Sequence, residues 1–410
     1  MTRHSNSRAS IVPVEGGITA PLGFRASGVA CGIKTNGRPD VALIATDRPV
    51  PAAGIFTLNQ AKAAPVVVSQ EHLESSGRRA QVVVTNSGCA NACTGGQGMA
   101  NAREMAALTA NLVGCAPSQA LVASTGVIGV ALKMDAVRQG IPAAVAALSR
   151  DGHSQAALAI MTTDPFPKAY AVEVTTANGR FRVGGMAKGS GMIEPQMATM
   201  LGYLTTDAAV EPEVLQRALS EACRSTFNAI TVDGESSTND CVFALASGDS
   251  GVLVDEALYD DLFEGLRAVA LELSLGIVRG GEGATKLIAI TVSGARSQDD
   301  AWTAARVIAN SPLVKTAVHG GDPNWGRLVA AAGRSGVTFS LDDAAVRIGP
   351  LVLFSNGQPH DELAPRAAEY LQGKELEIEV NVGAGGNGRA TIYTCDLSAE
   401  YVRINAEYRT

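Results

Sequence analysis

The sequence has few of the features of a membrane protein, a secreted protein or a nucleic-acid binder. No apolar run approaches the roughly 18 residues of a membrane span, and the polar N-terminus lacks the apolar core of a secretion signal. The formal net charge is -7 and the pI is ≈ 5.4, so no basic footprint for nucleic acid or an anionic membrane is present. We therefore expect a cytoplasmic enzyme of small molecules, without nucleic-acid or membrane partners.

Cysteine and histidine are also sparse. The 7 cysteines are scattered and form no C-x-x-C pair, which favours reduced thiols over a disulfide framework. The 5 histidines never occur at ligand spacing with one another or with cysteines, and no H-E-x-x-H is present. These patterns predict that the chain has no metal site.

Aromatic residues make up only 4% of the chain, whereas glycine is abundant at 44 residues. This composition suits small-residue strands, tight turns and close backbone approaches. At 410 residues the chain is too long for one compact core, so we expect two or three domains. The sequence texture changes beyond about residue 290, where we place a second domain.

Strand-like and helix-like stretches alternate along the chain. Val82–Val84 predicts a buried strand that runs into a turn-forming polar cluster, Thr85–Asn91. Alternating residues from Leu376 to Val382 predict a half-buried strand, which should form a hairpin with Ala390–Tyr393. Helices are predicted at Met99–Leu112, from Pro212 to Ala222, from Leu258 to Val269 with a stop at Gly280, and from Asp299 onward.

Two glycine-rich motifs resemble nucleotide-binding loops only in part. Gly383–Gly388 satisfies G-x-G-x-x-G, but a strand rather than a helix follows it, so we predict a hairpin turn. Gly280–Lys286 lacks the Gly-Lys-Ser/Thr ending of a phosphate loop. Glu282 in this second motif is flanked by glycines and could be presented to a ligand, although a solvated turn glutamate is the commoner explanation.

Thr199 occupies an unusual position. It lies between a Gly-rich segment that begins at Lys188 and the apolar, strand-like stretch Met200–Leu204. A threonine hydroxyl is a poor nucleophile without a base, and a threonine at a chain N-terminus can use its own amine, with an unperturbed pKa of roughly 8. An internal threonine gains that amine only if the chain is cut before it. By itself, the segment equally fits an ordinary loop before a buried strand.

Several ordered motifs resemble one known family. Gly191–Leu201, which reads GMIEPQMATML, resembles the self-cleavage segment of glutamate N-acetyltransferases, also called ornithine acetyltransferases, from arginine biosynthesis. The resemblance covers nearly the whole chain. Its other motifs are Pro21–Ala26, Ser124–Gly129, Met161–Asp164, Thr231–Gly234, Ser237–Asp240, Asp322–Arg327 and the ending Tyr401–Thr410.

The resemblance implies a specific architecture. The precursor would cut itself between Ala198 and Thr199 into an α chain (1–198) and a β chain (199–410), two of each forming a heterotetramer. The fold would be α/β, with a layered sheet-and-helix main domain at 1–289. A smaller C-terminal α/β domain at 290–410 would return its tail to the active site.

The resemblance also implies the reaction. Thr199 would take an acetyl group from N-acetylornithine, release ornithine, and pass the acetyl to glutamate through an acetyl-enzyme ester. Some family members also accept acetyl-CoA as donor. No metal or dissociable cofactor is required for this cycle.

Family positions map onto particular residues of this chain. The resemblance implies that the Thr125 hydroxyl and the Gly126 N–H stabilise the oxyanion of acyl transfer. It places substrate-binding residues at Thr162, Lys188, Thr199, Glu282, Asn405 and Thr410. Lys188 suits an α-carboxylate and Glu282 the cationic side of ornithine. From the residues alone, Thr125-Gly126 could be an everyday turn and Lys188 a solvated surface lysine.

Some residues depart from the family pattern, and two other functions stay open. Gln196 is more often Asn, Glu194 varies, and Glu235-Ser236 replaces the usual Asp-Thr; these differences bear on cleavage rate and substrate preference. One alternative is an N-terminal-nucleophile amidohydrolase or aminopeptidase, in which water replaces glutamate as acyl acceptor. The other is a non-catalytic amino-acid-binding relative that stays uncut.

Overall fold

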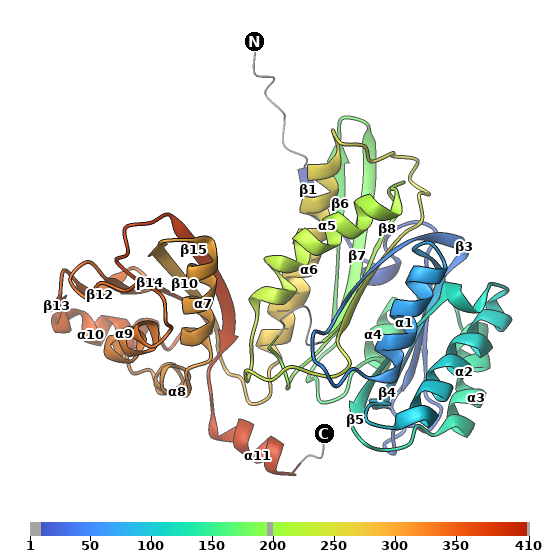
Figure 1. The fold of residues 1–410 in the computed structure, drawn as a ribbon, viewed down its shortest axis with the longest axis horizontal. Helices are drawn as coiled ribbons and strands as arrows, with labels where there is room; N and C mark the ends of the chain where they lie inside the picture. The colour runs from blue at the N-terminus through green and yellow to red at the C-terminus, as the bar shows by residue number, and fades with distance from the viewer. Residues whose placement is uncertain (1–9, 195–199, 408–410) are drawn as a thin grey trace.

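The computed structural model describes residues 10–194 and 200–407 and consists of a larger and a smaller part (Figure 1). The larger part is built on a 9-stranded sheet and the smaller part on a 6-stranded sheet. Helices pack on both sheets, so the predicted α/β class is confirmed. The predicted cleavage site at Ala198 and Thr199 lies outside the described residues, as do Gln196 and the predicted binding residue Thr410.

The larger sheet follows the order β1-β6-β7-β8-β9-β3-β4-β5, with β2 also paired to β3. Its strands are β1 (Ser10–Pro13), β2 (Arg25–Val29), β3 (Val41–Phe56), β4 (Arg79–Cys89), β5 (Ala120–Val127), β6 (Lys168–Thr176), β7 (Gly179–Lys188), β8 (Leu201–Thr206) and β9 (Cys241–Ala246). The long strand β3 joins two halves of this sheet, because its first part pairs with β4 and its last part with β9.

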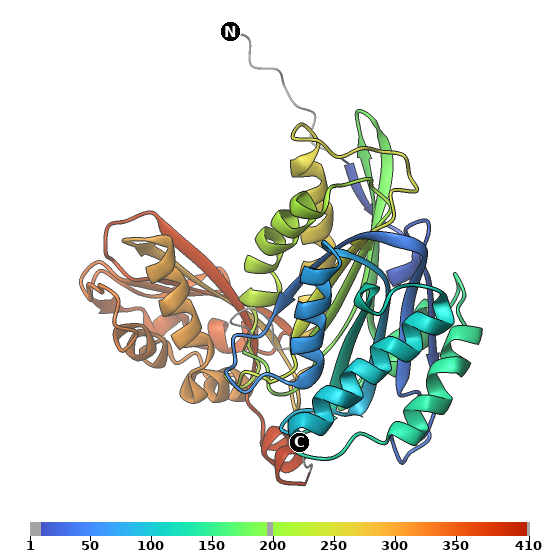
Figure 2. The same cartoon turned by 45° about the vertical axis from the view of Figure 1, so that its right-hand side comes forward.

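The two halves pack face to face. Since alternate side chains of a strand point to opposite faces, each half has an inner face toward the other half and an outer face. Phe243 of β9 and Val83 of β4 belong to one central cluster, whereas their neighbours Val242 and Val82 belong to outer clusters. Helices α5 (Pro212–Arg224) and α6 (Tyr259–Arg279) cover one outer face. The other outer face carries α1 (Ala64–Ser75), α2 (Gly95–Val113) and α3 (Met134–Ala146), and α4 (His153–Ala159) packs beside the central cluster. The resulting layers are helix, sheet, sheet and helix, as Figure 2 shows from the side.

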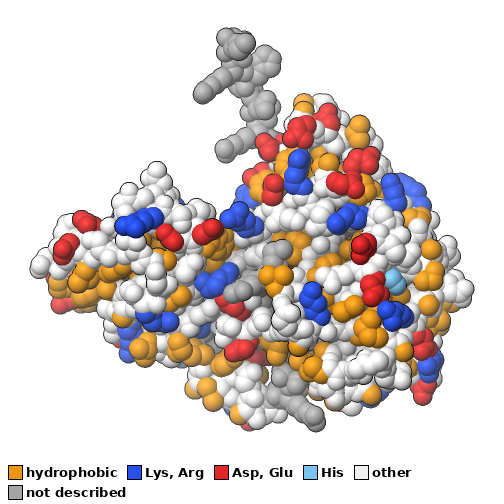
Figure 3. Space-filling view, in the orientation of Figure 1, with side chains coloured by type: hydrophobic (Ala, Val, Ile, Leu, Met, Phe, Trp, Pro, Cys, Tyr) orange, Lys and Arg blue, Asp and Glu red, His pale blue; other side chains and the backbone are white. Residues whose placement is uncertain are grey.

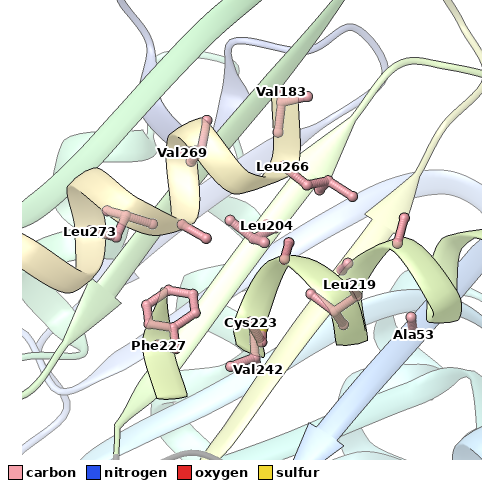
Figure 4. Close-up of a cluster of buried hydrophobic side chains, with 14 of the residues drawn as sticks. Ala53, Val183, Leu204, Leu219, Cys223, Phe227, Val242, Leu266, Val269 and Leu273 are labelled. Carbon is pink, nitrogen blue, oxygen red and sulfur yellow. The ribbon is translucent and has the colours of Figure 1, made fainter. Parts of the chain in front are cut away.

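Burial of apolar side chains fixes α5 and α6 on the sheet. Figure 4 shows Leu204 of β8 between Leu266 and Val269 of α6 on one side and Leu219 and Cys223 of α5 on the other. The helix α5 begins at Pro212 as the sequence predicts, and α6 ends at Arg279. The predicted helices at Met99–Leu112 and from Asp299 are likewise confirmed as parts of α2 and of α7 (Gln298–Ala309).

The smaller sheet follows the order β13-β12-β11-β14-β10-β15. In β14 the buried residues Leu376, Ile378 and Val380 alternate with more exposed ones, which confirms the predicted half-buried strand. The elements are β10 (Leu287–Ala295), α7 (Gln298–Ala309), α8 (Pro312–Gly320), α9 (Trp325–Gly333), β11 (Ala345–Ile348), β12 (Leu351–Ser355), β13 (Gln358–Pro359), α10 (Ala364–Tyr370), β14 (Glu375–Asn381) and β15 (Gly388–Cys395). The division at residues 289 and 290 stays a prediction; β10, the first strand of this sheet, begins at Leu287.

The predicted hairpin between β14 and β15 is wrong. β10 lies between these two strands and pairs with both, parallel to β14 and antiparallel to β15. The Gly383–Gly388 segment therefore crosses the end of β10 rather than making a tight turn. Gly386 and Gly388 run so close to the backbone of Ala295 and Ser297 that a Cβ atom at either position would overlap a carbonyl group.

The predicted turn cluster after Val84 is also wrong in its first part. Thr85 to Cys89 continue β4 and pair in parallel with residues 123–127 of β5. Polar side chains can be buried in this strand because they are hydrogen bonded. For example, Ser124 Oγ donates to Asn86 Oδ1 at 2.6 Å. The strand thus carries polar groups up to the edge of the pocket described below.

Charges on the surface are mixed. On the face in Figure 3, acidic and basic side chains are interspersed among apolar ones. Within the described residues no helix is both long enough and apolar enough to cross a membrane. All seven cysteines are free.

Candidate active site

One pocket gathers every predicted site residue that the structure describes. It lies where β5, β7, β8 and the segment before β9 meet the loop before β10 and the last helix, α11 (Ala399–Glu407). Met200, which directly follows Thr199 in the sequence, also lines it. The predicted residues in its wall are Thr125, Gly126, Thr162, Lys188, Glu282 and Asn405.

Thr125 and Gly126 lie near the end of strand β5 and do not form an isolated turn. Lys188 Nζ donates to Thr125 Oγ1 at 3.1 Å, and both side chains are buried. Gly126 has φ 131° and packs against the backbone of Gly88 and Cys89, at a register shift between β4 and β5. Only glycine fits this approach, because any Cβ would overlap the β4 backbone. Both residues therefore line the pocket from a fixed part of the strand.

Asn239 holds the two strand ends that carry this pair, a role that sequence reasoning missed. Its amide nitrogen donates to Ala90 O at 2.6 Å and to Ser124 O at 2.9 Å. Asn239 is buried and itself lines the pocket. Because Ser124 directly precedes Thr125, Asn239 positions the Thr125 hydroxyl through the backbone.

A buried ion pair between Asp164 and Lys168 supports the part of the pocket wall that contains Thr162 and Lys188. Asp164 accepts from Lys168 Nζ at 2.6 Å, from Gly189 N at 2.7 Å and from Thr162 N at 3.0 Å. Burial by itself raises the pKa of Asp164, but the ammonium groups of Lys168 and Lys188 outweigh it, and the pKa falls from 3.8 to about 2. Asp164 therefore fixes the backbone beside two predicted substrate-binding residues, Thr162 and Lys188.

Asp164→Asn should destabilise the fold by roughly 3–5 kcal/mol at pH 7, because it leaves Lys168 buried without a counter-charge. Since the pKa of folded Asp164 is about 2, its ionised form stabilises the wild type above about pH 4 and less as pH falls toward 2. Urea unfolding of both chains from pH 7 to pH 2 measures the difference, which should shrink with acid. Asp151→Asn, at an exposed aspartate, is the control. A difference in the free energy of unfolding that does not change with pH would contradict this account.

Glu282 is presented by a glycine-flanked loop, as the sequence suggested, but it is buried rather than solvated. Asn405 Nδ2 donates to Glu282 Oε2 at 2.9 Å, so the last helix reaches the pocket. The carboxylate lies so close to Gly191 that a Cβ at that position would overlap it. The loop and α11 thus hold one carboxylate over the pocket.

Asp233 and Glu194 fix the residues just before the predicted cleavage site. Asp233 accepts from the N–H groups of Met192 at 2.7 Å and Ile193 at 2.8 Å, and Met192 has φ 57°. Glu194 Oε1 accepts from Arg306 Nη1 of α7 at 2.6 Å. This flank is therefore anchored on residues far downstream in the chain, which the sequence does not reveal.

Asp240 completes the inner wall of the pocket. It is buried, and burial raises the pKa of its carboxyl well above the ordinary value of 3.8. Among the residues that the structure describes, no group of three or more His, Cys, Asp or Glu side chains is placed to hold a metal ion. The pocket instead offers hydroxyl, backbone N–H, ammonium and carboxyl groups, which suit acyl transfer between small charged molecules.

Comparisons with known proteins agree with this chemistry. The ArgJ family model matches residues 25–410. The arginine biosynthesis bifunctional proteins ArgJ of Synechococcus sp. and of Symbiobacterium thermophilum are 48% and 50% identical, over 97% and 96% of this chain and 98% and 99% of theirs.

A solved structure is similar as well. The crystal structure of arginine biosynthesis bifunctional protein argJ from Bacillus halodurans matches with a TM-score of 0.50 and 40% identity. The match covers 51% of this chain and 100% of that chain. The family resemblance of the sequence is confirmed: this chain belongs to the ArgJ family.

Proposed function

We propose that this chain transfers an acetyl group from N2-acetyl-L-ornithine to L-glutamate in arginine biosynthesis, through an acetyl ester on Thr199. The observation that carries the proposal is the pocket, which joins Thr125, Gly126, Lys188 and Glu282 beside Met200. Its relatives are named arginine biosynthesis bifunctional proteins. Acetylation of glutamate from acetyl-CoA is therefore part of the proposal.

The nucleophile is made by self-cleavage. The Thr199 hydroxyl attacks the Ala198 carbonyl, and the shift of the acyl group from nitrogen to oxygen turns the peptide bond into an ester and frees the Thr199 amine. Water then hydrolyses this ester, which releases the Ala198 carboxylate and restores the Thr199 hydroxyl. The Bacillus halodurans chain corresponds to about half of the present one, the length expected of one cleavage product. The products would be an α chain, 1–198, and a β chain, 199–410, two of each in the assembled enzyme.

The first half-reaction loads the acetyl group. The neutral Thr199 amine accepts the hydroxyl proton while Thr199 Oγ attacks the acetyl carbonyl carbon. The Thr125 hydroxyl and the Gly126 N–H stabilise the oxyanion, Thr199 keeps the acetyl group as an ester, and ornithine leaves with the proton. Glutamate then reverses these steps and takes the acetyl group. The cycle requires no dissociable cofactor.

Charged side chains orient the two substrates. Lys188 meets the α-carboxylate that N-acetylornithine and glutamate share, and Glu282 meets the side-chain ammonium of ornithine. Asn405 holds Glu282 through its 2.9 Å hydrogen bond, and Thr162 lines the same wall. Thr410 and the cytoplasmic location of the enzyme stay predictions from the sequence.

An acetyl-transfer assay on the purified protein tests the proposal. With N-acetylornithine and glutamate, we expect equal amounts of ornithine and N-acetylglutamate. Release of free acetate without any need for glutamate would instead favour the amidohydrolase alternative. An uncut chain without turnover would favour the binding protein.

Glu282→Gln should selectively weaken the reaction with N-acetylornithine. We expect kcat/KM for N-acetylornithine to fall roughly 10- to 100-fold, because a charge-assisted hydrogen bond to the ammonium is lost. Acetylation of glutamate from acetyl-CoA should change much less, since neither substrate has that ammonium. Glu235→Gln, at an exposed carboxylate on the rim of the same pocket, is the control. Unchanged kinetics with N-acetylornithine would remove Glu282 from this role.

A further inference from the structure

Asp240 is a buried carboxyl group of the pocket to which the proposed mechanism gives no role. It is only 3% exposed, and it lines the pocket together with Lys188. Within the described residues, its Oδ2 is the one buried side-chain nitrogen or oxygen without a hydrogen-bond partner. An unpaired buried polar atom destabilises a fold, so a bound group that pairs with Oδ2 would account for this residue.

The surroundings of Asp240 favour its neutral form. Burial raises its pKa well above the ordinary value, and neither a hydrogen bond with Ser237 nor the charge of Lys188 offsets this effect. Asp233, Glu235 and Glu282 also line the pocket, so an ionised Asp240 would add a fourth carboxylate there. A neutral carboxyl has an O–H donor, whereas an ionised one only accepts.

Strand register places Asp240 near Lys188. Lys188, Leu201 and Cys241 form one row across β7, β8 and β9, and Asp240 directly precedes Cys241. Neighbouring strands lie about 4.8 Å apart, so the backbones carrying Lys188 and Asp240 are roughly 10 Å apart at one end of the sheet. The Lys188 ammonium has three donors, of which Thr125 accepts one. Lys188 and Asp240 line the same pocket, so together they can offer two donors to one anionic oxygen group.

We propose that Asp240, as a neutral carboxylic acid, donates its O–H to the α-carboxylate of the bound amino-acid substrate, beside the Lys188 ammonium. The inference rests on the proposed function, because that function gives both substrates an α-carboxylate. Asp240 then binds N-acetylornithine and glutamate alike, whereas Glu282 distinguishes between their other ends. An ionised carboxylate at this position would repel both substrates.

Two variants and a shortened substrate test this role. Asp240→Asn keeps the shape and an N–H donor, and Asp240→Leu keeps the volume without any donor. N-acetylputrescine is N-acetylornithine without the α-carboxylate. We expect Asp240→Leu to lower kcat/KM for N-acetylornithine roughly 10- to 100-fold, with little change for N-acetylputrescine, and Asp240→Asn to stay within a few-fold of wild type for both.

Three results would overturn the proposal: equal losses with the two substrates, no loss in Asp240→Leu, or an Asp240→Asn chain as impaired as Asp240→Leu. The last result would mean that an ionised carboxylate is needed. Intact mass shows whether each variant is cut, and Asp240→Ala serves as a second donor-free chain. If neither donor-free chain is cut, Asp240 acts in processing and the proposal also fails. A wild type without acetyl transfer would instead refute the proposed function itself.

Discussion

Thr199→Ala should abolish both self-cleavage and acetyl transfer, and we expect the purified variant to be a single chain of about the full 42.1 kDa. Without the hydroxyl no ester can form at Ala198, so the amine that serves as base never appears. The same hydroxyl carries the acetyl group in turnover. Denaturing mass spectrometry and the acetyl-transfer assay measure the two losses separately.

Thr199→Ser is the matched control for this variant. Serine keeps the hydroxyl and lacks only a methyl group, so this chain should still cut itself and transfer acetyl, at reduced rates. Two fragments from the alanine variant would mean that another residue cuts the chain. Turnover by an uncut chain would mean that the reaction does not need the Thr199 amine.

Thr125→Val should lower kcat roughly 10²–10³-fold and leave KM nearly unchanged, because the Thr125 hydroxyl stabilises charge that develops only in the transition state. Valine has nearly the shape of threonine but lacks the hydroxyl group. Steady-state kinetics with N-acetylornithine and glutamate measure the effect, after intact mass has shown the fraction of cut chain.

Thr125→Ser retains the hydroxyl and should recover most of kcat. A valine variant within about twofold of wild type would remove Thr125 from the oxyanion pair and leave only the Gly126 N–H. A change confined to KM would mean that Thr125 binds the ground state of the substrate instead. The two variants thus separate the hydroxyl from the bulk of the side chain.

Local patterns predicted the helices well and the strand pairing poorly. The face of α5 can be read from Leu215, Ala218 and Leu219, because helix periodicity is a property of one short segment. The insertion of β10 between β14 and β15 depends on contacts between residues roughly 90 to 110 positions apart. The residues near Gly383 do not indicate that another strand lies between β14 and β15, so the hairpin prediction was wrong.

The candidate site shows the same contrast. The family motifs named Thr125, Lys188 and Glu282, and the fold brings these residues to one pocket. The supporting residues Asp164 and Asn239 were missed, although they lie in two of the motifs, because each acts through backbone groups of distant segments. Their side chains are ordinary types for turns, and only the three-dimensional structure shows their hydrogen bonds.

The central claim is that Thr199 becomes a chain terminus and then carries the acetyl group. The most direct test is the intact mass of the denatured protein before and after brief exposure to N-acetylornithine without glutamate. The account predicts two chains, 1–198 and 199–410, with the second chain one acetyl group heavier after exposure and restored by glutamate. A single 42.1 kDa species, or a second chain of unchanged mass, would contradict it.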